Sequence, residues 1–346
     1  MTIEKREENI TEELFALYRG YGYQRYKPGR FEEYALYRDN KDFLINKNVI
    51  TFTDLNGKLM AMRPDVTLSL IKHCASLQGQ TQKYFYNENV YRPSAGGKNF
   101  KEIAQTGVEF AGNISLTDVA ELTFIICKTL SAISADYALD ISHMAFTEGL
   151  FESYAADGQP LTEYLQTKNF HDFIKLAQEK GYSEKFIKAF EFALNFRGNA
   201  REYISEAKSI CLNGKMLTAV NEIAQLLEIA EKCGFGDKIN IDFSATANAD
   251  YYNGFIYNGY INGIPHRVLS GGRYDKLLQK LGKSGGAIGF ALYLGEIERY
   301  LIKDERPIDC VIVSDGKDVA SALMRAQKVA ESGKVVYVSN GNANKP

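Results

Sequence analysis

The sequence lacks the features that mark several large classes of protein. Its five cysteines are scattered, odd in number and form no Cys-x-x-Cys pair, which argues against a disulfide framework or a zinc site and favours a reducing compartment. No run approaches the roughly 20 apolar residues of a membrane span. The charged start MTIEKREENI has no apolar signal-peptide region. We expect a soluble, cytoplasmic protein with no metal, no cofactor and no membrane partner.

A strong charge of either sign is also missing. Lys and Arg number 41 and Asp and Glu number 43, so the formal net charge is -2. A near-neutral chain lacks the overall basic footprint of a nucleic-acid binder. The rest is ordinary for a globular protein, with 45% hydrophobic and 24% charged residues. The 346 residues are enough for a large core and more than one domain.

The apolar periodicity predicts two β-rich parts on either side of a helical insertion at about 148–238. Helices recur with apolar spacing of three and four residues, strands alternate with period two, and Gly and Pro separate them. Asp65 is placed as the N-cap of its helix, and Asn56-Gly57 predicts a hairpin turn. Before the insertion we predict helices at 3–20, 65–73 and 118–132, a hairpin of 43–54 and 58–63, and strands at 83–92, 100–110 and 137–143.

After the start of the insertion the same reasoning predicts a long helical stretch and then more strands. The expected helices are 160–167, 171–180, 184–195, 200–211 and 216–233, followed by strands 239–243, 255–261, 266–269 and 287–294 with helices 274–281 and 295–302. Residues 1–302 are therefore expected to form one α+β core. Residues 306–346 read as one short β-α-β unit, either an abbreviated or a truncated α/β domain, because a parallel pair needs more sheet to be stable alone.

One predicted strand carries two polar residues with a chemical use. Period-two alternation places Gln105 and Glu109 on the same face of the strand 100–110. A glutamine and a glutamate together can hold an ammonium or imidazole group. A solvated sheet face explains the same alternation, and alternation alone favours that simpler interpretation.

Two runs of aromatic and acidic residues lie close together near the end of the predicted core. They are Asp250-Tyr251-Tyr252-Asn253-Gly254 and Ser270-Gly271-Gly272-Arg273-Tyr274-Asp275. Such residues make a pocket that is partly polar and partly aromatic, and glycines let the backbone approach a small ligand. Taken singly, each of these side chains is explained equally well by ordinary packing.

Taken together and in order, these motifs resemble the catalytic core of class II histidyl-tRNA synthetases. They are more similar still to the non-synthetase paralogues of those enzymes, the regulatory subunits of ATP phosphoribosyltransferase, and the resemblance covers residues 8–302. It implies an antiparallel sheet of the class II synthetase type flanked by helices. The matching segments are Gly20-Tyr21-Gly22-Tyr23 with Pro28 (motif 1), Arg63-Pro64-Asp65-Val66-Thr67, Tyr91-Arg92 (motif 2), Gln105-Thr106-Gly107-Val108-Glu109 and the two aromatic runs above.

The resemblance also implies a binding site without catalytic residues. The residues that it assigns to a histidine-like pocket are Asp65, Thr67, Arg92, Gln105, Glu109, Tyr251, Tyr252 and Arg273. Motif 1 implies a homodimer formed through residues 8–60. The family implies a short-form ATP phosphoribosyltransferase catalytic subunit as a partner, histidine as a ligand, and no tRNA.

Several departures from the synthetase pattern concern the nucleotide side of the site. Ala247 stands where synthetases carry an arginine, Ser94 replaces the glutamate of motif 2, and in motif 3 Tyr293 and Glu296 replace a glycine and an arginine. Arg299 lies one helical turn further on. Adenylation must neutralise phosphate charge, so each lost arginine should cost roughly 3 kcal/mol of transition-state stabilisation.

This combination predicts a histidine sensor or scaffold in preference to a ligase. The main hypothesis is a non-catalytic regulatory subunit that confers activity and histidine feedback through a coupling free energy. A histidyl-tRNA synthetase, whole or truncated, is the alternative. A paralogue that transfers an amino acid to another acceptor is a third possibility, and the same arginine losses count against both.

Overall fold

The computed structural model describes residues 3–44, 48–74, 81–93, 99–154, 161–195, 198–245, 251–301, 308–314, 316 and 318–339. The chain divides into two compact units. One consists of Ile10–Ile297, and the other combines Met1–Asn9 with Glu298–Pro346. The predicted boundary at residues 302–306 stays a prediction.

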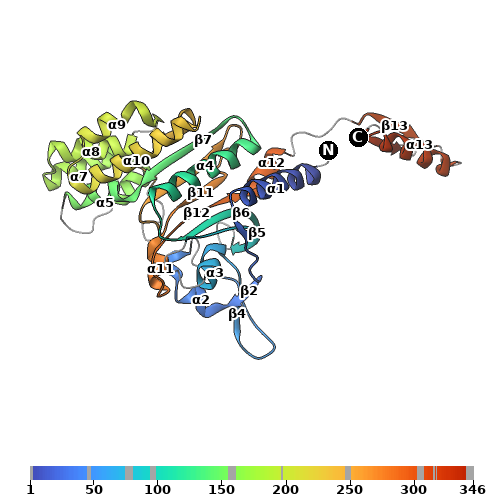
Figure 1. Ribbon diagram of the computed structural model, residues 1–346, viewed down its shortest axis with the longest axis horizontal. Coiled ribbons are helices and arrows are strands. Elements are labelled where there is room, and N and C mark those ends of the chain that lie inside the picture. Colours follow the sequence, from blue (N-terminus) through green and yellow to red (C-terminus); the bar gives the residue numbers. More distant parts are fainter. Residues whose placement is uncertain are drawn as a thin grey trace. The chain divides into compact units, whose positions relative to one another are not determined.

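A mixed, mainly antiparallel sheet forms the centre of the larger unit (Figure 1). Its six middle strands pair antiparallel, whereas β1 and β9 pair in parallel with β5 and β7. This arrangement confirms the predicted α+β class. In order across the sheet, the strands among the described residues are β1 (Gln24–Arg25), β5 (Gln82–Pro93), β6 (Phe100–Gly112), β12 (Gly286–Tyr293), β11 (Leu269–Arg273), β10 (Phe255–Ile261), β7 (Tyr137–His143), β9 (Ile239–Ile241) and β8 (Gly198–Asn199).

Helices α1 (Ile3–Gly20) and α4 (Leu116–Ile133) cover one face of this sheet (Figure 1). The rings of Phe15 and Tyr18 lie 5.1 and 5.7 Å from the ring of Phe85 on β5. The hydroxyls of Tyr18 and Thr129 are 3.1 Å apart and join the two helices. With this face filled by helices, the opposite face is left for a binding site.

A smaller sheet of three antiparallel strands stands beside the large one. Its order is β2 (Phe31–Glu33), β4 (Leu59–Met62) and β3 (Thr51–Thr53). The chain then continues from β4 into α3 (Val66–His73), which Asp65 caps as predicted. The predicted hairpin is confirmed but shorter, because residues 41–43 form a 3-10 turn, η1 (Lys41–Phe43), after α2 (Tyr34–Arg38). The apolar Phe43 favoured a strand in the prediction. In the structure it does not belong to a strand and is instead buried against Tyr251, with ring centroids 6.0 Å apart.

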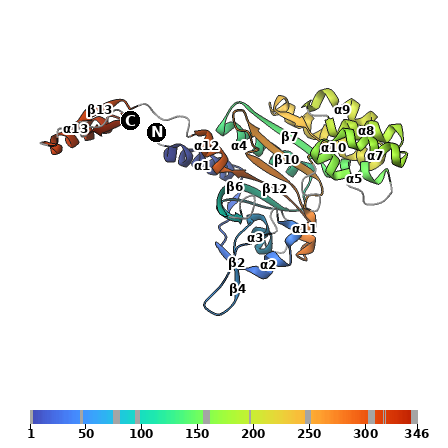
Figure 2. The same ribbon diagram turned by 180° about the vertical axis from the view of Figure 1, so that it is seen from behind.

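The predicted helical insertion forms a compact group next to β7 (Figure 2). Its centre is aromatic, and Phe173 and Phe190 stack with ring centroids 3.7 Å apart. All five helices expected in the insertion are present, and α5 precedes them. The elements are α5 (Met144–Glu152), α6 (Leu161–Thr167), α7 (Phe170–Lys180), α8 (Glu184–Asn195), α9 (Ala200–Ser209), α10 (Gly214–Lys232) and η2 (Gly236–Lys238).

One predicted strand is wrong in position. Residues 266–269 were expected to form it, whereas β11 runs over Leu269–Arg273 and contains the two glycines. A Cβ on Gly271 would lie 2.4 Å from the Gly289 carbonyl oxygen, and one on Gly272 would lie 2.6 Å from the Tyr252 ring. Glycine disfavours strands by local propensity, but here only glycine leaves room for the chains that cross over it.

The second unit contains the predicted β-α-β arrangement. β13 (Cys310–Val313) and β14 (Val336–Ser339) pair in parallel, with α13 (Val319–Glu331) between them in sequence. Its small core is made by Ile312, Ala322 and Ala326. Helices α11 (Asp275–Lys280) and α12 (Leu294–Leu301) complete the elements of the chain's described part.

Candidate functional site

A pocket lies on the face of the large sheet that α1 and α4 leave open. On β6, Phe110 points toward the helices, where its ring is 5.2 Å from that of Tyr23. Its neighbour Glu109 therefore points to the other face and into the pocket. The lining residues are Asp65, Thr67, Tyr86, Arg92, Gln105, Glu109, Tyr251, Tyr252, Ser270, Gly271, Tyr274, Gly289, Phe290, Ala291 and Tyr293.

Glycines let functional side chains lie flat on the floor of this pocket. Gly289 pairs with Glu109 across β12 and β6, and a Cβ on Gly289 would lie 1.7 Å from Glu109 Oε2. Gly107 pairs with Tyr86 across β6 and β5, and its Cβ would lie 2.5 Å from the Tyr86 hydroxyl. The floor is therefore shaped for these two side chains, which could not occupy their positions above any larger residue.

Glu109 is the buried acid at the deep end of the pocket, and only 2% of the residue is exposed. Thr67 Oγ1 donates to Glu109 Oε1 over 2.5 Å, and the Tyr274 hydroxyl donates to Oε2. Burial raises the pKa of Glu109 to about 8, against the lowering effect of these two donors. This burial rules out the solvated sheet face that alternation alone favoured.

Asp65 holds a second buried carboxyl next to Glu109. Its Oδ1 accepts from the Leu68 backbone N–H over 2.8 Å and caps α3. Its Oδ2 lies 3.8 Å from Arg92 Nη2. Burial raises the pKa of Asp65, and the Arg92 guanidinium opposes that rise. Asp65 thus starts a helix and also lines the pocket, so the two interpretations of this residue are compatible.

Tyrosines form the aromatic wall of the pocket. The ring of Tyr251 lies 4.7 Å from that of Tyr252 and 5.5 Å from that of Tyr274. Thr67 lowers the pKa of Tyr251 and Ser270 lowers the pKa of Tyr252, in each case against the larger effect of burial. Burial raises the pKa of all three hydroxyls. They therefore act as neutral hydrogen-bonding groups at any physiological pH.

Arg273 is the one predicted site residue that does not line the pocket. Its Nε donates to Asp275 Oδ1 and Oδ2 over 3.1 and 2.9 Å. Asn253 binds the same acid, because its Nδ2 donates to Asp275 Oδ2 over 3.1 Å and its Oδ1 accepts from the Asp275 N–H over 2.7 Å. This clasp joins the two aromatic runs that the sequence analysis singled out. Arg273 therefore supports the wall from outside, and Tyr274, the next residue, faces the ligand space.

The predicted site residues did not include four polar side chains of the lining. They are Tyr86, Ser270, Tyr274 and Tyr293. Each lies in a strand or directly after one, and each neighbours a glycine or a predicted site residue along the chain or across the sheet. Tyr86 lies opposite Gly107, and Tyr293 lies opposite Gln105. Directly opposite residues on paired strands share a face of the sheet. Pairing the predicted strands in register would therefore have predicted that Tyr86 and Tyr293 line the pocket.

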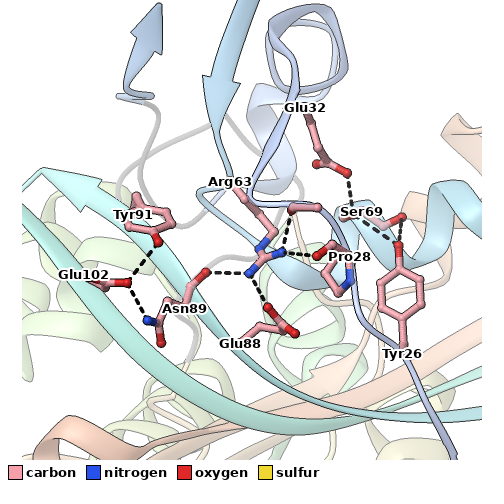
Figure 3. Close-up of polar contacts among 10 residues, drawn as sticks. Tyr26, Pro28, Glu32, Arg63, Ser69, Glu88, Asn89, Tyr91 and Glu102 are labelled. Atoms are coloured by element: carbon pink, nitrogen blue, oxygen red, sulfur yellow. Dashed lines mark hydrogen bonds and ion pairs between the residues drawn. The ribbon is translucent and has the colours of Figure 1, made fainter.

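Arg63 is a buried cation that was part of a matching segment but not of the predicted site residues. The residue is 0% exposed. Its Nη1 donates to the carbonyls of Pro28 and Gly29 over 3.1 and 2.6 Å, and its Nη2 donates to Glu88 Oε2 and the Asn89 carbonyl over 3.0 and 2.8 Å. Figure 3 shows the guanidinium enclosed by these groups. One side chain thereby fastens the segment before β2 to strand β5.

The residues that follow Arg63 are fastened to the same strand. The Tyr91 N–H donates to the Arg63 carbonyl over 2.9 Å, and Arg92 Nε donates to the Pro64 carbonyl over 2.8 Å. Asp65 is the next residue along the chain. The position of its carboxyl relative to Arg92 is therefore set by a backbone that is held from both sides.

Two residues of the expected nucleotide side, Ser94 and Ala247, fall outside the described residues, as does Asp250 of the first aromatic run. Of the remaining departures, Tyr293 lines the pocket and Glu296 lies in the first turn of α12. Within the described ranges, no group of three His, Cys, Asp or Glu side chains is placed to hold a metal. The same ranges include no helix with the length and apolar character to span a membrane.

This antiparallel sheet, with its pocket on the face opposite α1 and α4, is the core fold of class II aminoacyl-tRNA synthetases. It superposes on a histidyl-tRNA synthetase from Nostoc sp. PCC 7120 with a TM-score of 0.73 and 17% identity, over 100% of this chain and 84% of that one. A family model described as histidyl-tRNA synthetase matches residues 3–297. The chain belongs to the histidyl-tRNA synthetase family.

Similar proteins include regulatory subunits. The chain is 25% identical to the ATP phosphoribosyltransferase regulatory subunits of Bacillus thuringiensis (strain Al Hakam) and Bacillus cereus (strain AH820), over 96% of this chain and 82% of each relative. A solved structure from Bacillus halodurans, described as an ATP phosphoribosyltransferase regulatory subunit/histidyl-tRNA synthetase, has a TM-score of 0.78 at 23% identity, over 99% of this chain and 90% of that one. A chain of an ATP phosphoribosyltransferase complex from Thermotoga maritima has a TM-score of 0.66 at 18% identity, over 82% and 96%.

Proposed function

We propose that this chain is the non-catalytic regulatory subunit of ATP phosphoribosyltransferase in the first step of histidine biosynthesis. The similarity to curated regulatory subunits along almost the whole chain supports this role. So does the shared fold with a chain of a solved ATP phosphoribosyltransferase complex. The catalytic subunit would be a short form, which needs this partner for activity and for inhibition by histidine.

The observation that carries the ligand assignment is the charge arrangement in the pocket. Two buried carboxyls, Asp65 and Glu109, share the pocket with one cation, Arg92. A zwitterion with an additional basic group fits such a set, because its cationic groups find acceptors and its carboxylate finds a guanidinium. Free histidine has these groups, and the tyrosine wall offers flat surfaces for an imidazole ring.

Binding without adenylation is the second part of the proposal. Adenylation needs positive groups on the triphosphate. Among the described residues, the pocket's lining contains one arginine, and Asp65 is 3.8 Å from it. Tyr293 and Glu296 stand in the sequence where a synthetase carries a glycine and an arginine. The amino-acid side of the site is retained and the phosphate side is not, which supports a sensor over a ligase.

The decisive test is reconstitution with a short-form catalytic subunit. We expect the chain to raise phosphoribosyltransferase activity and histidine to lower it again. Glu109→Gln keeps the size of the side chain and removes the acceptor charge, so it should weaken histidine binding at least about tenfold while activation persists, since a hydrogen bond to a charged group contributes about 1.5–3 kcal/mol. Activity assays and calorimetry measure the two effects.

Glu184→Gln is the matched control, because Glu184 pairs with Lys188 on the exposed surface of α8, away from the pocket lining. It should change neither activation nor feedback. Histidine-dependent exchange between ATP and pyrophosphate by the chain alone would contradict the proposal. Histidylation of tRNA would then identify the alternative, a histidyl-tRNA synthetase.

We propose in addition that the chain forms a homodimer through residues 8–60. The small sheet offers an apolar outer face in this region, made by Phe31, Phe52, Met60 and Met62. The rings of Phe31 and Phe52 are 5.1 Å apart and the two residues are 54% and 37% exposed. In the strand register Phe31 lies opposite Met62, and Phe52 lies opposite Met60. Contiguous exposed apolar residues of this kind are typical of interaction sites.

Phe31→Glu is therefore expected to weaken dimerisation at least tenfold, because it places a charge inside an apolar contact. Sedimentation equilibrium measures the dissociation constant. Leu217→Glu is the control, since Leu217 is a similarly exposed apolar residue (41%) on α10 of the insertion. Equal dissociation constants for the wild type and Phe31→Glu would exclude this face from the interface.

A further inference from the structure

The pocket is smaller than the ligand that its chemistry suits. Its cavity volume is about 30 Å³. A single water needs about 10–15 Å³, so the enclosed part of the pocket has space for roughly two waters. An amino acid is larger than that. A lining side chain must therefore move before any amino acid can enter.

Most lining side chains are held in place. Glu109 accepts hydrogen bonds from Thr67 and Tyr274. The rings of Tyr251, Tyr252 and Tyr274 pack on one another, with centroids 4.7 and 5.5 Å apart. Arg92 and Asp65 are fixed by the Pro64 carbonyl and the Leu68 N–H. Moving Glu109, Arg92 or Asp65 would leave buried polar atoms without partners, at about 1–3 kcal/mol for each.

Tyr293 is different from these residues in two respects. Its side chain makes no hydrogen bond and no ring contact with the other residues that the structure describes. It is also partly exposed, whereas Tyr86 is 1% exposed. Tyr293 ends β12, and its ring shares the pocket face with Gln105, the residue opposite it on β6. Rotation about its χ1 angle therefore breaks no polar contact with them and opens the pocket.

The charges of the pocket determine which end of a bound amino acid lies next to the Tyr293 ring. The two acids, Asp65 and Glu109, are 7% and 2% exposed and form the deep end. The rim is made by the partly exposed lining residues Tyr252, Ser270 and Tyr293, with Ala291 beside them. A cationic group drawn to Glu109 leaves the carboxyl group of an amino acid toward Arg92, which lies on the same side of Glu109 along the β5–β6 hairpin as Gln105 and Tyr293. A substituent on that carboxyl therefore meets the Tyr293 ring.

We propose that Tyr293 is the size-determining residue of the pocket: its ring swings out to admit a free amino acid, closes over the carboxyl end and excludes amino acids whose carboxyl carries a bulky group. This inference rests on the proposed amino-acid pocket. It assigns to the chain a specificity for unmodified amino acids over their amides and esters. The side chain acts by occupying space, so the phenol ring matters and the hydroxyl does not.

The test compares L-histidine with L-histidine β-naphthylamide by calorimetry on the full chain. The wild type and Tyr293→Phe are expected to bind histidine at least tenfold more tightly than the amide. Tyr293→Ala should reduce that ratio at least tenfold, because it removes the ring. Tyr293→Val is a second variant that removes the ring but keeps a residue of high strand propensity, and it should reduce the ratio in the same way.

The possible results separate this inference from the proposed function. If the wild type binds histidine and the ratio of histidine to amide affinity is unchanged in Tyr293→Ala and Tyr293→Val, the role of Tyr293 is wrong and the proposed function still stands. A changed ratio in Tyr293→Phe contradicts an effect of ring size alone. Wild type that binds neither compound overturns the histidine pocket itself, and the specificity falls with it.

Discussion

Gly289→Ala is expected to abolish histidine binding and to destabilise the protein by about 3 kcal/mol or more, the upper range for overpacking of a core. The new methyl group would lie 1.7 Å from Glu109 Oε2 and 2.5 Å from the Val108 carbonyl oxygen. Glu109 cannot turn away without breaking its hydrogen bonds to Thr67 and Tyr274. The strands cannot separate without losing their ladder. Calorimetry and thermal unfolding measure the two losses.

The chain offers a matched control for this change. Gly214 is the first residue of α10, and a Cβ there would meet nothing within 4 Å. Gly214→Ala should therefore be neutral or slightly stabilising, by about 0.4–1 kcal/mol. Adding Glu109→Ala to Gly289→Ala removes the carboxyl group that clashes with the new methyl group. The double variant should therefore recover part of the lost stability. Full additivity of the two single changes would show that the clash is not the cause.

Arg63→Met is expected to cost about 3–5 kcal/mol, the range for breaking a buried ion pair by removal of one partner. The substitution leaves the largely buried Glu88, whose side chain is 12% exposed, without its cation and removes donors from the carbonyls of Pro28, Gly29 and Asn89. Arg63→Lys should recover little, because an ammonium cannot reach all four acceptors in the fixed geometry of a guanidinium. Urea unfolding measures the free energy of unfolding of each variant.

Arg38→Met is the control for Arg63. Arg38 pairs with Asp39 at 2.7 Å, but the two side chains are 59% and 58% exposed. Exposed pairs contribute about 0–1 kcal/mol, so this change should be nearly silent. If Arg63→Met and Arg38→Met lower the free energy of unfolding by similar amounts, the buried contacts of Arg63 do not stabilise the protein as inferred.

Local signals predicted most elements because their causes lie within a few residues. Asp65 caps α3 through the N–H three residues later, and Gly57 adopts the positive φ of 79° that the turn requires. The strand that was placed too early shows the limit of such signals. The glycines of β11 are dictated by Tyr252 and by β12, which are distant in the sequence.

The site was predicted in part for the same reason. Alternation placed Gln105 and Glu109 on one face, but whether that face is wet or buried depends on α3 and the tyrosine wall, which cover it from elsewhere in the chain. Arg63 was missed because its partners lie 25 to 35 residues away. Arg273 was included through resemblance to a motif, and its hydrogen bonds to Asp275 direct it away from the ligand space.

In the proposed function, the raised pKa of Glu109 couples binding of a cationic ligand group to the release of a proton. With a pKa of about 8, the empty pocket keeps a proton on this carboxyl at neutral pH. A positively charged ligand group that takes its place favours the ionised form and releases that proton to the solvent. Uptake of the ligand is then coupled to proton release, and affinity for the cationic group increases with pH up to about 8, where the empty site has already lost its proton. The occupancy of such a sensor depends on the ratio of the ligand concentration to the proton concentration, rather than on the ligand concentration alone.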